Sequence, residues 1–327
     1  MTLYPLKFKP LFFDKIWGGQ KIKTELNLDF GTLPNCGEAW MLCGFDQTDS
    51  VVANGALKDN TLSELVEIYM GELVGEKVYQ KFGLLFPLLV KWIDANDDLS
   101  VQVHPDDELA QEMYGNVLGK TEMWYIQDAE KGAKLICGLK DGVNKDTYIA
   151  GVAGRTLSLL REHNVNKNDL YYIPAGTVHA LQSGLLLAEI QEASDITFRI
   201  YDWDRRDEHG HERQLHKEEA LKAIKFEGTD AGLVRYAKKE NVVNSMLYSP
   251  FFQTNYLNIT ETFERDLSDT DSFVIYLCGD GAGVLHTPNA EDVAIKKGEL
   301  VLIPAICDEV KITPSPTLTL LETFMQQ

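Results

Sequence analysis

The 327-residue sequence lacks any apolar run of about eighteen residues, the length that a membrane-spanning helix needs, so no membrane partner is expected. It has only five cysteines, an odd number, and they are scattered without a C-x-x-C pair. This excludes a disulfide framework and a thiolate zinc site, and it favours reduced thiols in the cytoplasm. The first residues show no basic segment followed by an apolar core, so no signal peptide is expected.

Positive charge is also scarce, because 31 Lys and Arg stand against 50 Asp and Glu, for a formal net charge of −19. Such a chain repels nucleic acid at long range, so no nucleic-acid partner is expected. The same field repels a phosphorylated substrate, and a site for a phosphate ester therefore needs a local cluster of Lys and Arg. No self-complementary apolar stripe stands out, and we expect a monomer.

Segments with a helical period are few. Helices are expected at residues 62–82, 106–114 and 217–224, with weaker helical character over 146–163. The rest of the chain reads as short apolar strands punctuated by Gly, Pro, Asn and Asp. Many such strands predict a mainly β fold, a sandwich or barrel, with a few short helices.

Two stretches of the chain repeat one pattern. Residues 167–175 read KNDLYYIPA and residues 297–305 read KGELVLIPA, each a turn, an apolar strand and Pro-Ala. In cupin jelly rolls this pattern leads to a metal-binding histidine, and the first copy continues to His179 whereas the second carries no histidine. We therefore predict two cupin-type jelly rolls: a catalytic, metal-binding domain over 1–235 with a small helical insertion, and a domain without a metal site over 236–327.

Two further features of the second half have plain interpretations. The segment 228–244 is polar and charged with a weak apolar pattern, which fits a domain boundary. Residues 279–283 read GDGAG and are expected to form a hairpin turn. They do not fit a phosphate-binding loop, because no strand–loop–helix order surrounds them.

Four residues form a pattern that suits a metal ion. Gln102 and His104 stand two residues apart, and on a strand such side chains share a face. Glu122 begins another apolar strand, and His179 follows a Pro-Ala-Gly turn. Two imidazoles, a carboxylate and an amide oxygen suit Zn²⁺, and also Fe²⁺ or Mn²⁺. The order of these elements is the layout of a cupin metal site.

These residues and their neighbours resemble the type I mannose-6-phosphate isomerases (phosphomannose isomerases) of the cupin superfamily, especially the short bacterial members. The similar stretches occur in the family's order over about the first two-thirds of the chain, and the last third matches only as a generic second cupin. The stretches are WGG at 17–19, GEAWM at 37–41, FPLLVK at 86–91, LSVQVHP at 99–105, GKTEMWY at 119–125, IPAGTVHA at 173–180 and the segment 189–205.

The resemblance implies one zinc ion per chain, held by the four candidate ligands above, with Gln102 the ligand least firmly assigned. It implies Arg199 as the active-site arginine, and interconversion of mannose 6-phosphate and fructose 6-phosphate through a cis-enediol. Longer members of the family carry a sizeable helical insertion, of which this chain retains only the 62–82 helix and short pieces. Residues that those members draw from the insertion cannot be carried over.

An aldose–ketose isomerase needs a base and a cation near the developing enediolate. Arg199 is the candidate cation. Glu189 is the candidate base, because it lies in an apolar strand that would raise the pKa of its carboxyl group. Two alternatives remain open: an ion pair between Glu189 and Arg199, and a base provided by a metal-bound water or by the surroundings of His179.

Two lysines in apolar surroundings could supply the local positive charge that a phosphorylated substrate needs. Lys91 stands in the run LLVKWI, and Lys120 precedes Glu122 by two residues, so it shares that strand's site-facing side. We expect both lysines to contact the phosphate or the sugar, and Lys120 also to take part in catalysis. Trp17 is expected to line the sugar pocket, although a plain core position suits it equally well.

Two other functions compete with the isomerase. An Fe²⁺-dependent cupin oxidoreductase usually has more histidines and an H-x-H pair, where this chain has Gln102-Val103-His104. A sugar-binding or regulatory cupin without catalysis would not need an intact ligand set together with Arg199. The isomerase is therefore the favoured interpretation.

Overall fold

The computed structural model describes residues 3–45, 48–115, 117–152, 154–206, 209–288 and 290–325. Its first part contains, in chain order, β1 (Leu6–Lys9), β2 (Leu11–Phe13), α1 (Lys21–Thr24), β3 (Glu38–Leu42), β4 (Val51–Val52), α2 (Leu62–Val74), α3 (Glu76–Phe82), β5 (Leu88–Ala95), β6 (Val101–Val103), α4 (Asp107–Tyr114), β7 (Glu122–Ala129), β8 (Lys134–Leu139), α5 (Lys145–Val152), a 3₁₀ turn (Thr156–Leu159), β9 (Leu160–Asn164), β10 (Leu170–Ile173), β11 (His179–Leu181), β12 (Leu185–Glu192), β13 (Phe198–Tyr201), α6 (Lys217–Ala223) and β14 (Gly232–Val234).

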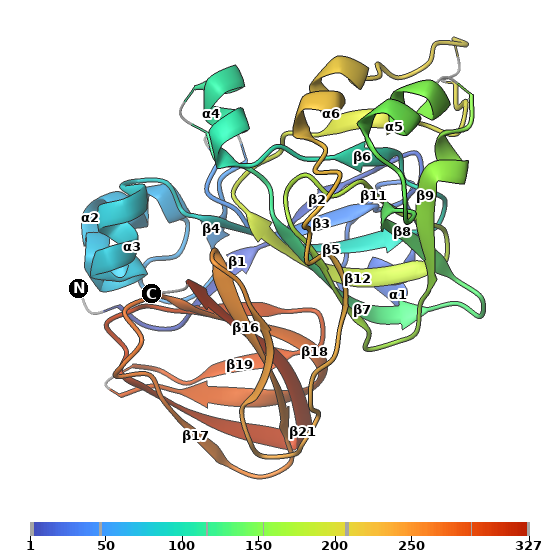
Figure 1. Ribbon diagram of the computed structural model, residues 1–327. Helices are drawn as coiled ribbons and strands as arrows, with labels where there is room; N and C mark the ends of the chain where they lie inside the picture. Colours follow the sequence, from blue (N-terminus) through green and yellow to red (C-terminus); the bar gives the residue numbers. More distant parts are fainter. Residues whose placement is uncertain are drawn as a thin grey trace.

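Two antiparallel sheets of this part pack face to face (Figure 1). The larger sheet has the strand order β14-β10-β7-β12-β5-β3-β2, and the smaller has the order β13-β6-β11-β8-β9. An apolar cluster joins their facing sides, with Ile93 and Trp124 from the larger sheet and Leu135 and Leu181 from the smaller. Helices α5 and α6 cover the outer face of the smaller sheet.

The C-terminal part is built from one curled nine-stranded sheet (Figure 1, orange to red). An apolar cluster fills its interior, and a second, larger cluster joins it to the outer face of the seven-stranded sheet and to α2 and α3. Its strands are β15 (Asn244–Tyr248), β16 (Phe252–Ile259), β17 (Phe263–Asp266), β18 (Val274–His286), β19 (Val293–Lys296), β20 (Leu300–Ile303) and β21 (Glu309–Met325), joined by β1 and β4 from the start of the chain.

The predicted fold class, mainly β with a few short helices, is confirmed. The nine-stranded sheet includes a strand from far away in the sequence, because β1 pairs with both β20 and β4. Strand β14, which lies inside the predicted boundary segment, pairs with β10 of the larger sheet. The division into 1–235 and 236–327 stays a prediction, with the N-terminal strand lying in the sheet of the second part.

Three helices lie close to their predicted places, with local corrections. The helix predicted over 62–82 is divided by Gly75, whose φ of +96° ends α2 and starts α3. A capping box between Thr61 and Glu64 begins α2. The weak helical prediction over 146–163 is wrong at its end, because the chain pairs with β8 as strand β9 from residue 160 onward.

The hairpin predicted at residues 279–283 is wrong. Strand β18 continues through this stretch and stays paired with β21, with register shifts between Cys278 and Asp280 and between Gly281 and Gly283. A β-bulge inserts an extra residue and bends a strand, and it often uses glycine with positive φ. Gly281 has φ +75°, and a Cβ there would lie 2.0 Å from the Thr317 carbonyl oxygen. The glycines therefore allow a bent strand to continue.

Over the described ranges, the helices are all too short or too polar to span a bilayer.

Candidate active site

The five-stranded sheet brings three of the predicted residues into one row. His179 opposes Gln102 across β11 and β6, and Gln102 opposes Arg199 across β6 and β13. Opposed residues on antiparallel strands point to the same face. Val101 and Val103 pack on the other face with α5 and α6, so the row faces the larger sheet.

The turn before β11 places the second histidine beside the first. Gly176 has φ +89°, which glycine tolerates and other residues rarely adopt. Its backbone N–H donates to the His104 carbonyl at 2.9 Å. The chain then enters β11 at His179, whose ring centroid lies 4.7 Å from that of His104. A Pro-Ala-Gly turn therefore has a direct role in bringing the two imidazoles together.

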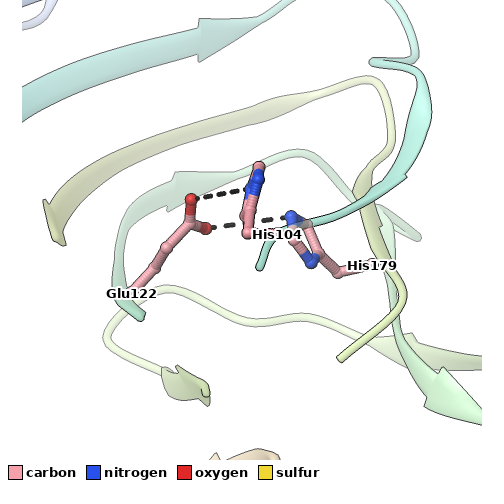
Figure 2. Close-up of side chains that lie close together, drawn as sticks. All are labelled: His104, Glu122 and His179. Carbon is pink, nitrogen blue, oxygen red and sulfur yellow. Dashed lines mark ion pairs between the residues drawn. The ribbon is translucent and has the colours of Figure 1, made fainter. Parts of the chain in front are cut away.

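Figure 2 shows the carboxylate of Glu122 facing both imidazoles. Its Oε1 lies 3.1 Å from His104 Nε2, and its Oε2 lies 3.9 Å from His179 Nε2. The exposed fraction of each side chain is 1% or less. The candidate ligand atoms all lie within 4.8 Å of one another, which is close enough for one metal ion to contact all three.

Both imidazoles are held in the form that binds a metal. His104 Nδ1 lies 2.7 Å from the Ile196 carbonyl oxygen, and His179 Nδ1 lies 2.8 Å from that of Thr177. A carbonyl only accepts, so each Nδ1 carries the proton and each Nε2 presents its lone pair. Burial, helped by the charge of Lys120, lowers the pKa of His104 to about 3, and burial also lowers the pKa of His179.

The carboxylate of Glu122 is charged and short of hydrogen bonds. Burial would raise its pKa, but the charge of Lys120, whose Nζ lies 3.0 Å from Oε1, and the two imidazoles hold the pKa well below its usual range. Both carboxylate oxygens and His104 Nε2 are buried without a hydrogen bond of normal geometry. Buried polar atoms are almost always satisfied, so these orphaned atoms fit a divalent cation.

The amide of Gln102 faces the same cluster. Its Nε2 lies 3.3 Å from His179 Nε2. The two ends of an amide have the same shape, so a rotated side chain presents its oxygen in that place. All four residues predicted from the sequence thus meet at one point, and their assignment as ligands stays a prediction.

A second charged group lies on the larger sheet. Lys91 is opposed by Glu189 on β12, and its Nζ lies 3.1 Å from Glu189 Oε1 and 3.8 Å from Glu38 Oε2. Trp124 Nε1 donates to Glu189 Oε2 at 2.9 Å. Burial and the charge of Glu122 raise the pKa of Glu189, although Lys91 opposes the shift. The ion-pair alternative for Glu189 therefore involves Lys91, and no Glu189–Arg199 ion pair occurs among the described residues.

A cavity of about 250 Å³ extends from the Lys91–Glu189 pair on the larger sheet to Gln102 on the smaller sheet. Six of the predicted residues line it: Trp17, Lys91, Gln102, Lys120, Glu189 and Arg199. Sequence reasoning missed Lys15, Glu38, Asp195 and Arg213, which also line it. Glu38 lies in the GEAWM stretch and could have been found there, whereas an isolated lysine or arginine in a loop gives no signal of its own.

Comparison with known proteins places this geometry in context. A family model described as phosphomannose isomerase type I, catalytic domain, matches residues 6–137. The chain is 36% identical to the mannose-6-phosphate isomerase ManA of Bacillus subtilis (strain 168), over 95% of this chain and 96% of that protein. It is 34% identical to the mannose-6-phosphate isomerase of Streptococcus mutans, over 92% of each.

A solved structure agrees with the fold. The crystal structure of the mannose 6-phosphate isomerase from Bacillus subtilis matches with a TM-score of 0.87 at 32% identity, over 98% of this chain and 99% of that chain. The predicted fold of two cupin-type jelly rolls is confirmed by this likeness.

Proposed function

The chain belongs to the type I phosphomannose isomerase family, and from this premise we propose that it interconverts mannose 6-phosphate and fructose 6-phosphate with a zinc ion bound. One observation carries the proposal: the buried cluster of His104, Glu122 and His179 adjoins a cavity that holds both Glu189 and Arg199. Ionisable groups with perturbed pKa values in a cavity are typical of catalytic sites. A protein that only binds sugar has no use for this combination.

We assign the zinc ligands to His104, Glu122 and His179, with the amide oxygen of Gln102 as the fourth. Two neutral imidazoles and one carboxylate leave a bound divalent cation with net positive charge. When bound, such an ion supplies charge stabilisation at the oxygens of the reacting sugar. Fe²⁺ and Mn²⁺ suit the same donor set, and metal analysis distinguishes them.

Glu189 is the base in this proposal. From the aldose it takes the proton on C2, which gives a cis-enediol, and it returns the proton to C1 while the hydroxyl proton moves from O2 to O1. The substrate neither gains nor loses atoms. Burial supports this role because it raises the pKa of Glu189, so that the carboxyl can hold the proton between the two steps. Lys91 and the Trp124 N–H keep its orientation fixed.

Two cations are placed to balance the developing negative charge. Arg199 lies next to Gln102 in the row across the smaller sheet, and it is the proposed cation at the enediolate. Lys120 lies beside Glu122 and points into the same cavity, where it contacts the sugar oxygens in this proposal. Lys91 supports the base and lies within reach of the substrate, and Trp17 forms a wall of the cavity.

A coupled assay tests the proposal. Mannose 6-phosphate should be converted to fructose 6-phosphate, and oxygen should not be consumed. A metal-loaded protein that is inactive on this pair, yet consumes oxygen with another substrate, would support the Fe²⁺-dependent oxidoreductase instead. A protein that binds the sugar phosphate without turning it over would support the non-catalytic cupin.

The predicted monomer, the cytoplasmic location and the absence of a nucleic-acid partner stay predictions. The charge of −19 supports the last of these.

A further inference from the structure

The two imidazoles of the proposed metal site are held in different ways. His179 Nδ1 donates to the Thr177 carbonyl, two residues away in the same turn. His104 Nδ1 donates at 2.7 Å to the Ile196 carbonyl, which is 92 residues away along the chain. The orientation of His104 therefore depends on a distant segment that the fold must bring to it and hold there.

That segment is the turn of residues 192–196, which carries the chain from β12 in the larger sheet to β13 in the smaller sheet. Beyond Glu192 it is neither helix nor strand. Its backbone closes tightly, because the Ser194 N–H donates to the Glu192 carbonyl at 2.7 Å. A fixed shape of this turn is what keeps the Ile196 carbonyl in place for His104.

Gln191 holds the 192–196 turn from inside the protein. Its side chain is fully buried, and its Nε2 donates to the Glu192 carbonyl at 2.9 Å and to the Ser194 carbonyl at 2.6 Å. An amide nitrogen has two hydrogens, so one side chain serves both carbonyls. Because the two carbonyls point at one donor, they would repel each other if that donor were removed.

The place of Gln191 fits a role in positioning and not in contact with the substrate. Gln191 is opposed by Glu122 across β12 and β7, so both side chains point into the interior. It is not among the described residues that line the cavity. Its Oε1 is buried without a hydrogen-bond partner, which lowers stability. An apolar side chain of the same size would have no such atom, so the contribution of Gln191 comes from its Nε2 hydrogens.

We propose that Gln191 is a positioning residue of the metal site: by holding the 192–196 turn, it fixes the Ile196 carbonyl and, through it, His104. The proposal rests on the proposed function for the identity of the metal as zinc. Without the Nε2 donor, the Ser194 carbonyl turns away and the Ile196 carbonyl moves with it. His104 is then free to rotate or to carry its proton on Nε2, and a protonated Nε2 cannot bind a metal ion.

The test compares Gln191→Met with the matched control Gln127→Met. Gln127, on β7, is also buried, and its Nε2 donates at 2.8 Å to the carbonyl of Gly279 in the C-terminal sheet. Zinc affinity is measured by competition with a chelator, and the tautomer of His104 by NMR of the ring nitrogens in metal-free protein. Gln191→Met should bind zinc about tenfold to a hundredfold more weakly and lose the single Nδ1-protonated form of His104. Gln127→Met should match the parent in both measurements.

Urea denaturation of the metal-free proteins separates positioning from a general loss of stability, because both substitutions remove a buried hydrogen-bond donor. Both should lower the free energy of unfolding, whereas only Gln191→Met should change the zinc affinity and the His104 tautomer. Two results would overturn the proposal: a folded Gln191→Met with the parent's zinc affinity and tautomer, or an equal loss of zinc affinity in Gln127→Met.

If Gln191→Met fails to fold, Gln191→Asn replaces it. Its amide is one methylene shorter and reaches only one of the two carbonyls, so we expect an intermediate loss of zinc affinity. A parent that binds no zinc would refute the proposed zinc-dependent function, and the His104 tautomer in parent and variant would still test the positioning role. A parent that binds zinc and is indifferent to either substitution at Gln191 would refute the positioning role alone.

Discussion

A buried glutamate lies in each half of the molecule, and the two have opposite surroundings. Glu322 on β21 is fully satisfied: Arg265 Nε and Nη2 donate to its two oxygens at 2.8 and 3.2 Å, and Tyr276 and Asn255 donate at 3.0 and 2.7 Å. Glu122 on β7 is equally buried, yet neither of its oxygens has a hydrogen bond of normal geometry. A buried carboxylate whose oxygens accept hydrogen bonds supports a fold, whereas one whose oxygens accept none fits a bound cation.

The two repeated stretches, residues 167–175 and 297–305, show the same contrast in the residue that follows them, His179 or Glu309. Asn168 and Gly298 both have positive φ, at 66° and 89°, and each leads into an equivalent short strand, β10 or β20. The first copy then delivers His179 into the interior, with an exposed fraction of 1%. The second delivers Glu309, which is exposed, and the described residues of its sheet contain no cluster of His, Cys, Asp or Glu that could hold a metal ion. The jelly roll therefore provides the positions, and the side chains decide whether they hold a metal.

Removing the unsatisfied glutamate should have the largest effect on function. Glu122→Ala takes away the proposed anionic ligand that faces the two imidazoles, so we expect loss of bound zinc and a fall in kcat of about a thousandfold or more. Elemental analysis and the isomerase assay on the same sample check this. Full zinc occupancy in the variant would remove Glu122 from the ligand set.

Removing the satisfied glutamate should affect stability instead. Glu322→Ala leaves Arg265 without its carboxylate, which should lower the free energy of unfolding by about 3 to 5 kcal/mol. Zinc content and kcat below the unfolding temperature should stay near those of the parent. Urea denaturation measures the free energy of unfolding, and elemental analysis and the isomerase assay measure zinc content and kcat. A variant as stable as the parent but depleted of zinc would show that Glu322, and not only Glu122, supports the metal site.

Arg199→Ala distinguishes residues that hold the metal from a residue that takes part only in catalysis. Arg199 lies beside Gln102 but is not a ligand candidate, so the variant should retain zinc while kcat falls by about a hundredfold. Single-point kinetics cannot separate binding from chemistry, so KM is measured as well. A kcat close to the parent's would remove Arg199 from the mechanism.

A third buried glutamate gives the smallest predicted effect on function. Glu192 accepts a hydrogen bond from the Thr121 N–H at 2.8 Å, and burial together with the charge of Asp107 raises its pKa to about 8. A carboxyl with a raised pKa stabilises the fold fully below its unfolded pKa, near 4.5, and this stability is lost as the pH rises toward 8. Glu192→Gln should remove a stability difference between pH 5 and pH 9 on the order of 4 kcal/mol, as the rise of the pKa from 4.5 to about 8 implies. Denaturation curves at the two pH values check this, and an unchanged difference would show that Glu192 is ionised in the folded protein.

The spacing of residues along the sequence predicts much of the candidate site. The two-residue spacing of Gln102 and His104 determines that both face one side of β6, and a Pro-Ala-Gly turn determines how the chain reaches His179. The spacing of nearby residues does not predict which distant segments pair with one another. The Lys91–Glu38 contact depends on the register of β3 against β5, and Arg213 reaches the cavity from a loop that Asp202 anchors. The predicted turn at Gly281 is a bent strand, because glycine with a positive φ occurs in turns and in bulged strands alike.

The most direct test of the account measures metal content and isomerase activity on one sample before and after chelation. We predict one zinc ion per chain, loss of mannose 6-phosphate turnover when the zinc is removed, and recovery when zinc is restored. Undiminished turnover by protein shown to be free of metal would contradict the claim that the unsatisfied atoms of His104, Glu122 and His179 form a zinc site.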